Sequence, residues 1–234
     1  MVEVDGELLL FDVGITLKRL KVCLGEVNRS IDDISAVLVS HAVHIDHIRG
    51  AKALSTNKIA MLRLFAEHKP AQIPAELHYS IRHGVKISTF RATIMPFRLS
   101  HDDPCTGYTV EDKAGNKIAI VADSGCFPEE SIPYLFGCDL IQIEFNYDRD
   151  MLEQSPYNEN LKDRIRGNLG HMENRKSREV LECVAWDGLK YVVPAHLSDT
   201  NNDTRLVAYE AQKAVPEAEV IVAGHGATDM VTLI

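Results

Sequence analysis

The sequence predicts a layered α/β sandwich in which helices cover the faces of β-sheets. Short apolar runs typical of strands cluster in the first half of the chain, and helical patterns alternate with strands later on. The chain has 234 residues, 45% of them hydrophobic, which is enough to bury a sizeable core. It contains no repeat, low-complexity segment or Pro/Gly/Ser-rich linker, so we expect a single domain spanning residues 1–234.

The first half begins with an expected hairpin. Residues 2–11 alternate around Asp5-Gly6 and then run apolar, which indicates a tight turn that leads into a buried strand. The segment 57–90 has no readable pattern. The other elements expected in this half are a helix over 16–27, a strand over 34–39 and a helical pattern over 48–56.

The second half alternates strands with helices. Ala114-Gly115-Asn116 is typical of the turn between two strands. The expected strands cover residues 92–100, 106–122, 140–144, 189–194 and 219–223, and the expected helices cover 175–186 and 204–214.

Composition limits the classes of function. The formal net charge of −9 argues against a protein that coats nucleic acid by bulk charge, although a nuclease with a local basic patch fits. No signal peptide and no membrane partner are expected, because no apolar run approaches the roughly 18–20 residues of a spanning helix. The five cysteines are odd in number and lack C-x-x-C spacing, which indicates reduced thiols in a cytoplasmic protein.

The residues that carry chemistry begin with a histidine cluster at 40–47, which reads S-H-A-V-H-I-D-H and follows the strand expected over 34–39. Three histidines and an aspartate within seven residues are hard to explain by packing. Neutral imidazole and carboxylate are the ligands that hold zinc and similar divalent ions. Because a tight loop at a strand end can direct several of them at one point, the sequence predicts a metal site here.

This cluster resembles the H-x-H-x-D-H motif of the metallo-β-lactamase superfamily, which lies at a strand end after an upstream D-x-G. Asp12-Val13-Gly14 matches the upstream element. The resemblance implies a metallo-β-lactamase-like αββα sandwich that binds two divalent cations, with zinc expected first and manganese or iron as alternatives. It also implies that the family's opening strand and its glycine/serine-rich turn are missing before Met1.

Later segments are similar to the YycJ/WalJ branch of this superfamily, whose members are described as metal-dependent exonucleases that act on DNA. The segments that resemble this branch are 144–148, 151–152, 161–167 and 170–174. The segments 99–102, 121–125 and 194–198 resemble later motifs of the whole superfamily. The resemblance to the superfamily therefore continues along most of the chain.

The resemblance also assigns roles to individual residues. It implies two metal sites and a bridge between them, with these ligands: His41, His44 and His101; Asp46, His47 and His196; and the bridging Asp123. Asp46 is in addition expected to orient the nucleophile. His171 is expected to protonate the leaving oxygen or to stabilise the phosphorane, because related nucleases have a histidine at this point of the chain.

The histidine motif departs from the family in its register. His44 falls in place, but the first histidine position is occupied by Ala42, and His41 lies one residue early. Two interpretations stay open: the loop bulges so that His41 still binds, or one metal site lacks a ligand. Ser40 favours the bulge, since a serine or threonine usually precedes the family's first histidine.

A basic segment around His171 indicates an anionic substrate. Six basic residues lie within 162–178, against two acidic ones. Arg164 and Arg166 are expected to bind substrate, because the forked guanidinium donors suit phosphate; a solvated helix face is the alternative. Further candidates for hydrogen bonds to phosphate or to metal ligands are Asn146, Asn174, Ser198 and Asn202. The histidines that match no motif are expected to be structural or surface residues: His68, His78, His83 and His225.

Three functions stay open from the sequence. The first is a DNA exonuclease of the YycJ/WalJ type. The second is a cyclic nucleotide or other small-molecule phosphodiesterase, which the acidic net charge and the short chain fit better; a steep salt dependence of activity would instead favour the polymer. The third is a non-catalytic protein with a degenerate metal site, suggested by Ala42 and opposed by the retention of the other ligands.

Overall fold

The computed structural model describes residues 1–57, 63–224 and 231–233, so His225 lies outside the described residues. The chain divides into two compact units, Met1–Pro96 and Phe97–Ile234, called here the N-terminal and the C-terminal unit. The expectation of a single domain over residues 1–234 stays a prediction.

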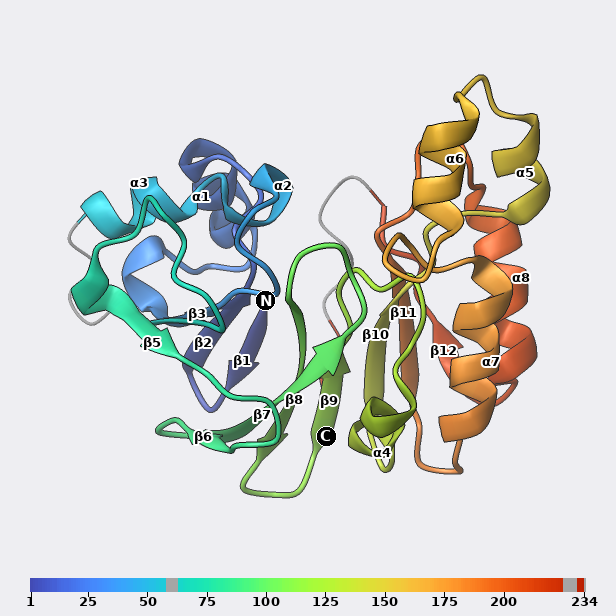
Figure 1. Cartoon of the computed structure of the whole chain (residues 1–234). Helices are drawn as coiled ribbons and strands as arrows, with labels where there is room; N and C mark the ends of the chain where they lie inside the picture. Colours follow the sequence, from blue (N-terminus) through green and yellow to red (C-terminus); the bar gives the residue numbers. More distant parts are fainter. Residues whose placement is uncertain (58–62, 225–230, 234) are drawn as a thin grey trace. The chain divides into compact units, whose positions relative to one another are not determined.

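The N-terminal unit is built on a five-stranded sheet (Figure 1). Its strands, in sheet order, are β1 (Val2–Val4), β2 (Glu7–Phe11), β3 (Ile34–Leu38), β4 (Arg63–Ala66) and β5 (His78–Ser80). β1 and β2 are antiparallel, and the other pairs are parallel. Asp5 and Gly6 both have positive φ, 48° and 82°, as a two-residue hairpin turn requires, so the predicted hairpin is confirmed.

Helices bury one face of this sheet. α1 (Leu17–Glu26) is capped by Thr16, whose hydroxyl accepts the N–H of Arg19. The helical pattern expected over 48–56 is split into α2 (Ile45–Ile48) and α3 (Ala51–Thr56). Gly50 lies at the break, where a Cβ atom would come within 2.5 Å of the Ile15 carbonyl oxygen. The described residues of this unit also form two 3-10 turns, η1 (Ile31–Asp33) and η2 (Ala75–Leu77).

The N-terminal core joins sheet to helices through buried aliphatic side chains, among them Leu8, Leu10, Val37, Leu20 and Leu54. Strands β4 and β5 fall within residues 57–90, where the sequence has no readable pattern. Both are only three or four residues long and pair in parallel with distant segments, so no local signal indicates them.

The second sheet has seven strands, and the division between the units falls inside one of them, β7. In sheet order they are β12 (Glu219–Val220), β11 (Tyr191–Ala195), β10 (Leu140–Glu144), β9 (Lys117–Ile120), β8 (Cys105–Asp112), β7 (Ala92–Leu99) and β6 (Ile87–Ser88). β9 to β12 run parallel, whereas β8 is antiparallel to β9. The expected turn between β8 and β9 is confirmed, with Gly115 at φ 92°.

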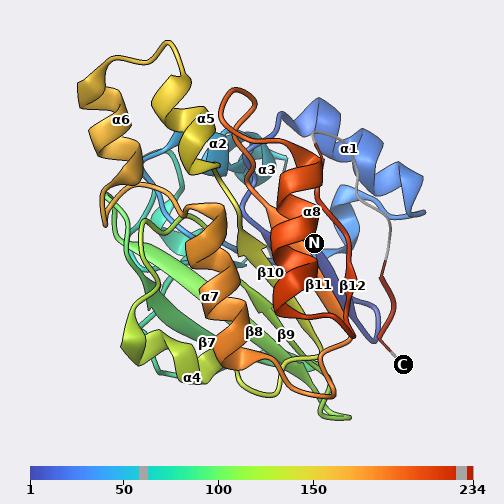
Figure 2. The ribbon, with the colours of Figure 1, turned by 90° about the vertical axis from the view of Figure 1, so that its right-hand side faces the viewer.

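The helices of the C-terminal unit lie mainly on one face of its parallel strands, as Figure 2 shows for α7 and α8 in front of β10 and β11. They are α4 (Ile132–Leu135), α5 (Arg149–Gln154), α6 (Glu159–Arg166), α7 (Asn174–Val184) and α8 (Thr204–Ala214), and a 3-10 turn, η3 (Glu129–Ser131), precedes α4. The core they form with the sheet includes Ile141, Ile143, Leu181, Val207 and Ala211. The predicted α/β architecture of sheets covered by helices is therefore confirmed in each unit.

The sequence did not predict α5 and α6, which are short and largely polar. Each begins at a side-chain cap: Asp148 accepts the N–H of Met151, and Asn158 accepts the N–H of Leu161. Among the described residues, no helix is long and apolar enough to cross a membrane.

Candidate metal centre

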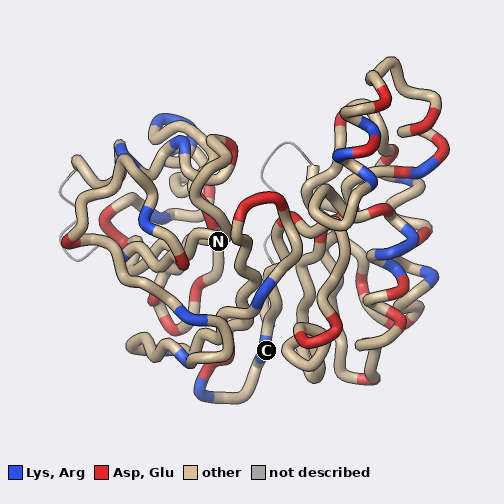
Figure 3. The backbone as a smooth tube through the Cα atoms, in the orientation of Figure 1, with Lys and Arg blue, Asp and Glu red and all other residues tan. Residues whose placement is uncertain are grey.

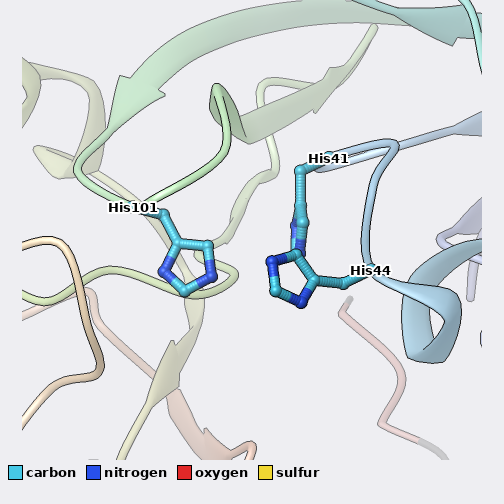
Figure 4. A group of neighbouring side chains, drawn as sticks. All are labelled: His41, His44 and His101. Atoms are coloured by element: carbon cyan, nitrogen blue, oxygen red, sulfur yellow. The ribbon is translucent and has the colours of Figure 1, made fainter. Parts of the chain in front are cut away.

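The histidine cluster of the N-terminal unit occupies the loop between β3 and the start of α2. The rings of His41 and His44 meet edge to face with centroids 5.0 Å apart, and both side chains project from this loop in Figure 4. The ring of His47, on α2, lies 4.0 Å from that of His41. His41 and His47 are buried, whereas the side chain of Asp46 is 63% exposed.

The geometry of this loop bears on the register of the histidine motif. His41 lies one residue early in sequence, yet its ring is packed between those of His44 and His47. Ala42, which occupies the usual register, has no side-chain atom that could bind a cation. The loop and the start of α2 thus bring three imidazoles together within the N-terminal unit, and His41 as a metal ligand stays a prediction.

The C-terminal unit contributes a second cluster, formed by Asp123, Glu144, His171 and His196. Ligand atoms of these four residues all lie within 4.8 Å of one another. Asp123 follows β9, Glu144 ends β10, and His196 follows β11 directly, with a left-handed φ of 58°. Because the three strands are parallel neighbours, their carboxyl ends meet at one edge of the sheet and bring these side chains together.

Glu144 lies behind the two histidines of this cluster and is completely buried. Its Oε1 accepts Nδ1–H of His171 at 2.8 Å and of His196 at 2.9 Å. Its Oε2 accepts the backbone N–H groups of Ser124 at 2.8 Å and Met172 at 3.2 Å. Four donors leave this carboxylate little capacity to bind a cation, and donation from Nδ1 places the lone pair of each neutral imidazole on Nε2.

Glu144 is a candidate functional residue that the sequence pattern alone does not single out. It belongs to the segment 144–148, which resembles the YycJ/WalJ branch, but the segment alone assigns it no role. The sequence does contain one signal for Glu144. The residue is a carboxylate at the end of an apolar run, and polar side chains at the carboxyl end of a strand often belong to a site.

The pKa of His171 is raised above its ordinary value of 6.5. Burial, the largest single influence, lowers this pKa, but the hydrogen bond to Glu144 and the charges of Glu144 and Asp123 together outweigh it. An imidazole that holds its proton to higher pH is suited to donating that proton to a leaving group.

His101, labelled in Figure 4, lies in the loop after β7, where the backbone of a different segment holds its ring. Its Nδ1 donates to the Gly170 carbonyl oxygen at 2.9 Å, which leaves Nε2 as the nitrogen with the lone pair. Nε2 lies 3.8 Å from Asp123 Oδ2 and 3.2 Å from Asp102 Oδ1. A divalent cation suits this environment of imidazole nitrogens and carboxylate oxygens.

The asparagines and the serine expected to bind phosphate make hydrogen bonds to neighbouring loops. Asn146 donates to the carbonyl oxygen of His196 at 2.9 Å, and the Ser198 hydroxyl accepts the N–H of Asn201. Asn174 and Asn202 bind each other through both amides. These contacts support the loop that carries His196, and contact with substrate stays a prediction.

Most of the basic side chains around His171 are already in ion pairs or hydrogen bonds. Arg164 pairs with Asp102 at 2.6 Å, and Arg166 pairs with Glu153 and Asp163. Lys162 is buried and donates to a backbone carbonyl. Figure 3 shows Lys and Arg interleaved with Asp and Glu along α5, α6 and α7. Arg164 and Arg166 would have to exchange these partners to bind phosphate, and their role in substrate binding stays a prediction.

The arrangement of imidazoles and carboxylates at strand ends defines a metal-dependent hydrolase. A family model described as a beta-lactamase superfamily domain matches residues 9–197, and the chain belongs to this superfamily. Proteins of this fold bind divalent metals, which the donor clusters of both units fit. The superfamily and the fold class predicted from the sequence are confirmed.

Particular relatives match most of the chain. Exodeoxyribonuclease YycJ of Bacillus anthracis is 27% identical over 222 residues, which cover 91% of this chain and 83% of the relative. Exodeoxyribonuclease WalJ of Streptococcus pneumoniae is 27% identical over 228 residues, 93% of this chain and 84% of the relative. The metallo-β-lactamase fold protein YhfI of Bacillus subtilis shares the fold with a TM-score of 0.73 at 20% identity, over 97% of this chain and 88% of that one.

Proposed function

We propose that the chain is a two-metal phosphodiesterase that degrades DNA as an exonuclease. The observation that carries the proposal is the cluster of Asp123, His171 and His196 around the buried Glu144, since it joins metal-type donors to an imidazole suited to acid catalysis. The similarity to YycJ and WalJ over most of their lengths supports DNA as the substrate.

The proposed metal ligands come from both units. One cation would be held by His41, His44 and His101, the other by Asp46, His47 and His196, with Asp123 shared between them. Two such cations lower the pKa of a shared water and neutralise the oxygens of a phosphodiester. Zinc is the metal we propose first, because imidazole dominates the donor set; manganese and iron accept the same ligands.

The protein's own residues would orient the reactants and move the proton. Asp46, whose carboxylate is exposed, would align the attacking water. His171 would protonate the leaving oxygen from Nε2, because its Nδ1 is engaged by Glu144 and its pKa is raised. Arg164, Arg166 and the amides of Asn146 and Asn202 would contact the phosphates that flank the scissile bond.

We also propose a cytoplasmic location. No disulfide joins any two of the five cysteines, all of which lie in the described part of the chain. Thiols that stay reduced are typical of proteins in a reducing compartment.

Metal content and substrate range test the proposal together. The wild-type chain, purified without chelator, is expected to contain about two divalent cations and to shorten end-labelled linear DNA, with activity that falls steeply as salt rises. Asp123→Ala is expected to lose metal and to reduce the rate by at least about 100-fold, because it removes a carboxylate shared by both cations. Elemental analysis and gel-based nuclease assays measure the two effects.

Asp187→Ala is the matched control, since Asp187 is an exposed carboxylate of the same unit. It is expected to keep both the metals and the activity. Hydrolysis of cyclic nucleotides without attack on DNA would replace the exonuclease by a small-molecule phosphodiesterase. A wild-type chain that takes up no metal and hydrolyses neither substrate would contradict the proposal.

A further inference from the structure

A carboxylate and a hydroxyl lie behind the histidine cluster of the N-terminal unit. Asp12 follows β2 with a left-handed φ of 57°, a conformation that aspartate tolerates better than most residues. Its N–H donates to the Leu38 carbonyl oxygen at 2.8 Å, and the N–H of Val13 donates to the His47 carbonyl oxygen at 2.7 Å. The backbone around Asp12 is thereby fixed against both the end of β3 and the start of α2.

The Asp12 carboxylate accepts three short hydrogen bonds. Oδ1 accepts the N–H of Ser40, and Oδ2 accepts both the Ser40 hydroxyl and Nδ1 of His47, each at 2.7 Å. The Ser40 hydroxyl oxygen also lies 3.0 Å from Nδ1 of His41. One carboxylate and one hydroxyl thus reach two of the three imidazoles, and Ser40 is 5% exposed, so water competes little for these contacts.

Counting protons decides the tautomers of both rings. A carboxylate only accepts, so His47 must donate from Nδ1 and the Ser40 hydroxyl must donate its single proton to Asp12. The contact between Ser40 and His41 can then be a hydrogen bond only if the imidazole donates it. Both rings therefore carry hydrogen on Nδ1 and keep the Nε2 lone pair, which is the form that binds a cation.

We propose that Asp12 and Ser40 are positioning residues that fix His41 and His47 as Nε2 metal ligands. The assignment rests on the proposed metal site and extends it, since neither residue is among the proposed ligands. For His41 the role is specific to this chain. Its register is shifted by one residue, and the hydroxyl of its immediate neighbour sets the tautomer and orientation of its ring.

Imidazole tautomers in the metal-free protein give the first test. Long-range ¹H–¹⁵N correlation spectra, recorded at a pH of about 8, well above the ordinary imidazole pKa of about 6.5, distinguish Nδ1–H from Nε2–H. The wild-type chain is expected to show Nδ1–H for both His41 and His47. Ser40→Ala removes the acceptor of His41, so His41 is expected to shift toward Nε2–H. His47 loses only the longer of its two contacts, 3.2 Å to the Ser40 hydroxyl oxygen, and is expected to keep its tautomer through Asp12.

Zinc affinity, measured by competition with a chromophoric chelator, gives the second test. Ser40→Ala is expected to weaken binding by about 10–100-fold, as loss of a hydrogen bond to a ligating histidine does elsewhere. Ser40→Thr keeps the hydroxyl and is expected to restore affinity. Ser55→Ala is the control, because the Ser55 hydroxyl donates to the Lys52 carbonyl oxygen on the surface of α3.

Asp12→Asn provides an independent variant if Ser40→Ala does not fold, as judged by far-UV circular dichroism. It keeps the size of the side chain but leaves one amide oxygen where two carboxylate oxygens accept, so the Nδ1–H form of His47 is expected to be lost. A wild-type chain that binds no zinc would defeat the proposed function, whereas the tautomers would still test this inference. Unchanged tautomers and zinc affinity in Ser40→Ala would overturn the inference and leave the proposed function intact.

Discussion

Glu144 shows how a single buried carboxylate can set the chemistry of two histidines. Four donors converge on it, two imidazoles on one oxygen and two backbone N–H groups on the other. Glu144→Gln keeps the shape but replaces one acceptor by an NH₂ group, which leaves buried donors without an acceptor. We expect the free energy of unfolding to fall by about 1–3 kcal/mol, as measured by urea denaturation of the metal-free protein.

The free energy of unfolding lost in Glu144→Gln is expected to depend on pH, because the pKa of His171 is raised in the folded protein. A pKa that is higher in the folded state stabilises the protein fully below the unfolded value, near 6.5, and this stability disappears as pH rises through the folded pKa. The difference between wild type and Glu144→Gln should therefore be larger at a pH of about 6 than at about 8.5. Glu179→Gln, an exposed change on α7, is expected to show neither effect. A difference that grows with pH would contradict this account.

At the scale of elements, the loop between α6 and α7 supports residues of the proposed site. It supplies the Gly170 carbonyl oxygen to His101, and the Asn168 carbonyl oxygen accepts the Ser100 hydroxyl. Gly125 allows this close approach, since a Cβ atom there would lie 2.3 Å from the Gly167 carbonyl oxygen and 2.5 Å from Gly170 N. The loop that contains Gly125 and the loop between α6 and α7 can approach this closely only because residue 125 lacks a side chain.

Gly125→Ala is expected to lower the free energy of unfolding by about 1–3 kcal/mol, because the atoms it meets are backbone and cannot rotate away. Gly25→Ala is the matched control. Gly25 lies in α1 with open space around it, so alanine there should stabilise the helix by up to about 1 kcal/mol. Thermal unfolding of the two variants compares them directly. Equal unfolding midpoints for the two variants would show that the close approach of the loops does not require glycine at position 125.

At the scale of the whole molecule, each unit has its own buried core, and the proposed ligands are divided between the units. The single tryptophan, Trp186, belongs to the C-terminal unit, where its indole N–H donates to the Cys138 carbonyl oxygen. Its fluorescence therefore follows unfolding of the C-terminal unit. Zinc at about 100 times its dissociation constant is expected to raise the midpoint of this signal by roughly 5–10 °C.

His44→Ala, a change in the N-terminal unit, is expected to remove most of this zinc-dependent shift, because the proposed ligand set of His41, His44 and His101 loses one member. His68→Ala is the control, since His68 is exposed and matches no motif. The proposal of shared ligands fails if Trp186 reports the same zinc-dependent shift in His44→Ala as in the wild type.

Much of the site could be predicted from the sequence because its signals are local. The histidines and the aspartate of residues 40–47 lie in one loop and the short helix that follows it, directly after one strand, so the chain itself holds them close. The turn at Gly115 and the hairpin at Asp5-Gly6 likewise depend on a few adjacent residues whose backbone conformation the sequence specifies.

The tertiary structure alone decided the parts that depend on distant partners. The donors to Glu144 lie 20 to 52 residues away, and Arg164 finds Asp102 at a separation of 62 residues. The parallel pairing of β4 and β5 is also non-local. Sequence patterns report local conformation and burial, whereas the partner of a buried polar group depends on which strand ends meet. The sequence by itself therefore determined the superfamily and its candidate ligands, and the fold determined which nitrogen of each histidine can bind a metal.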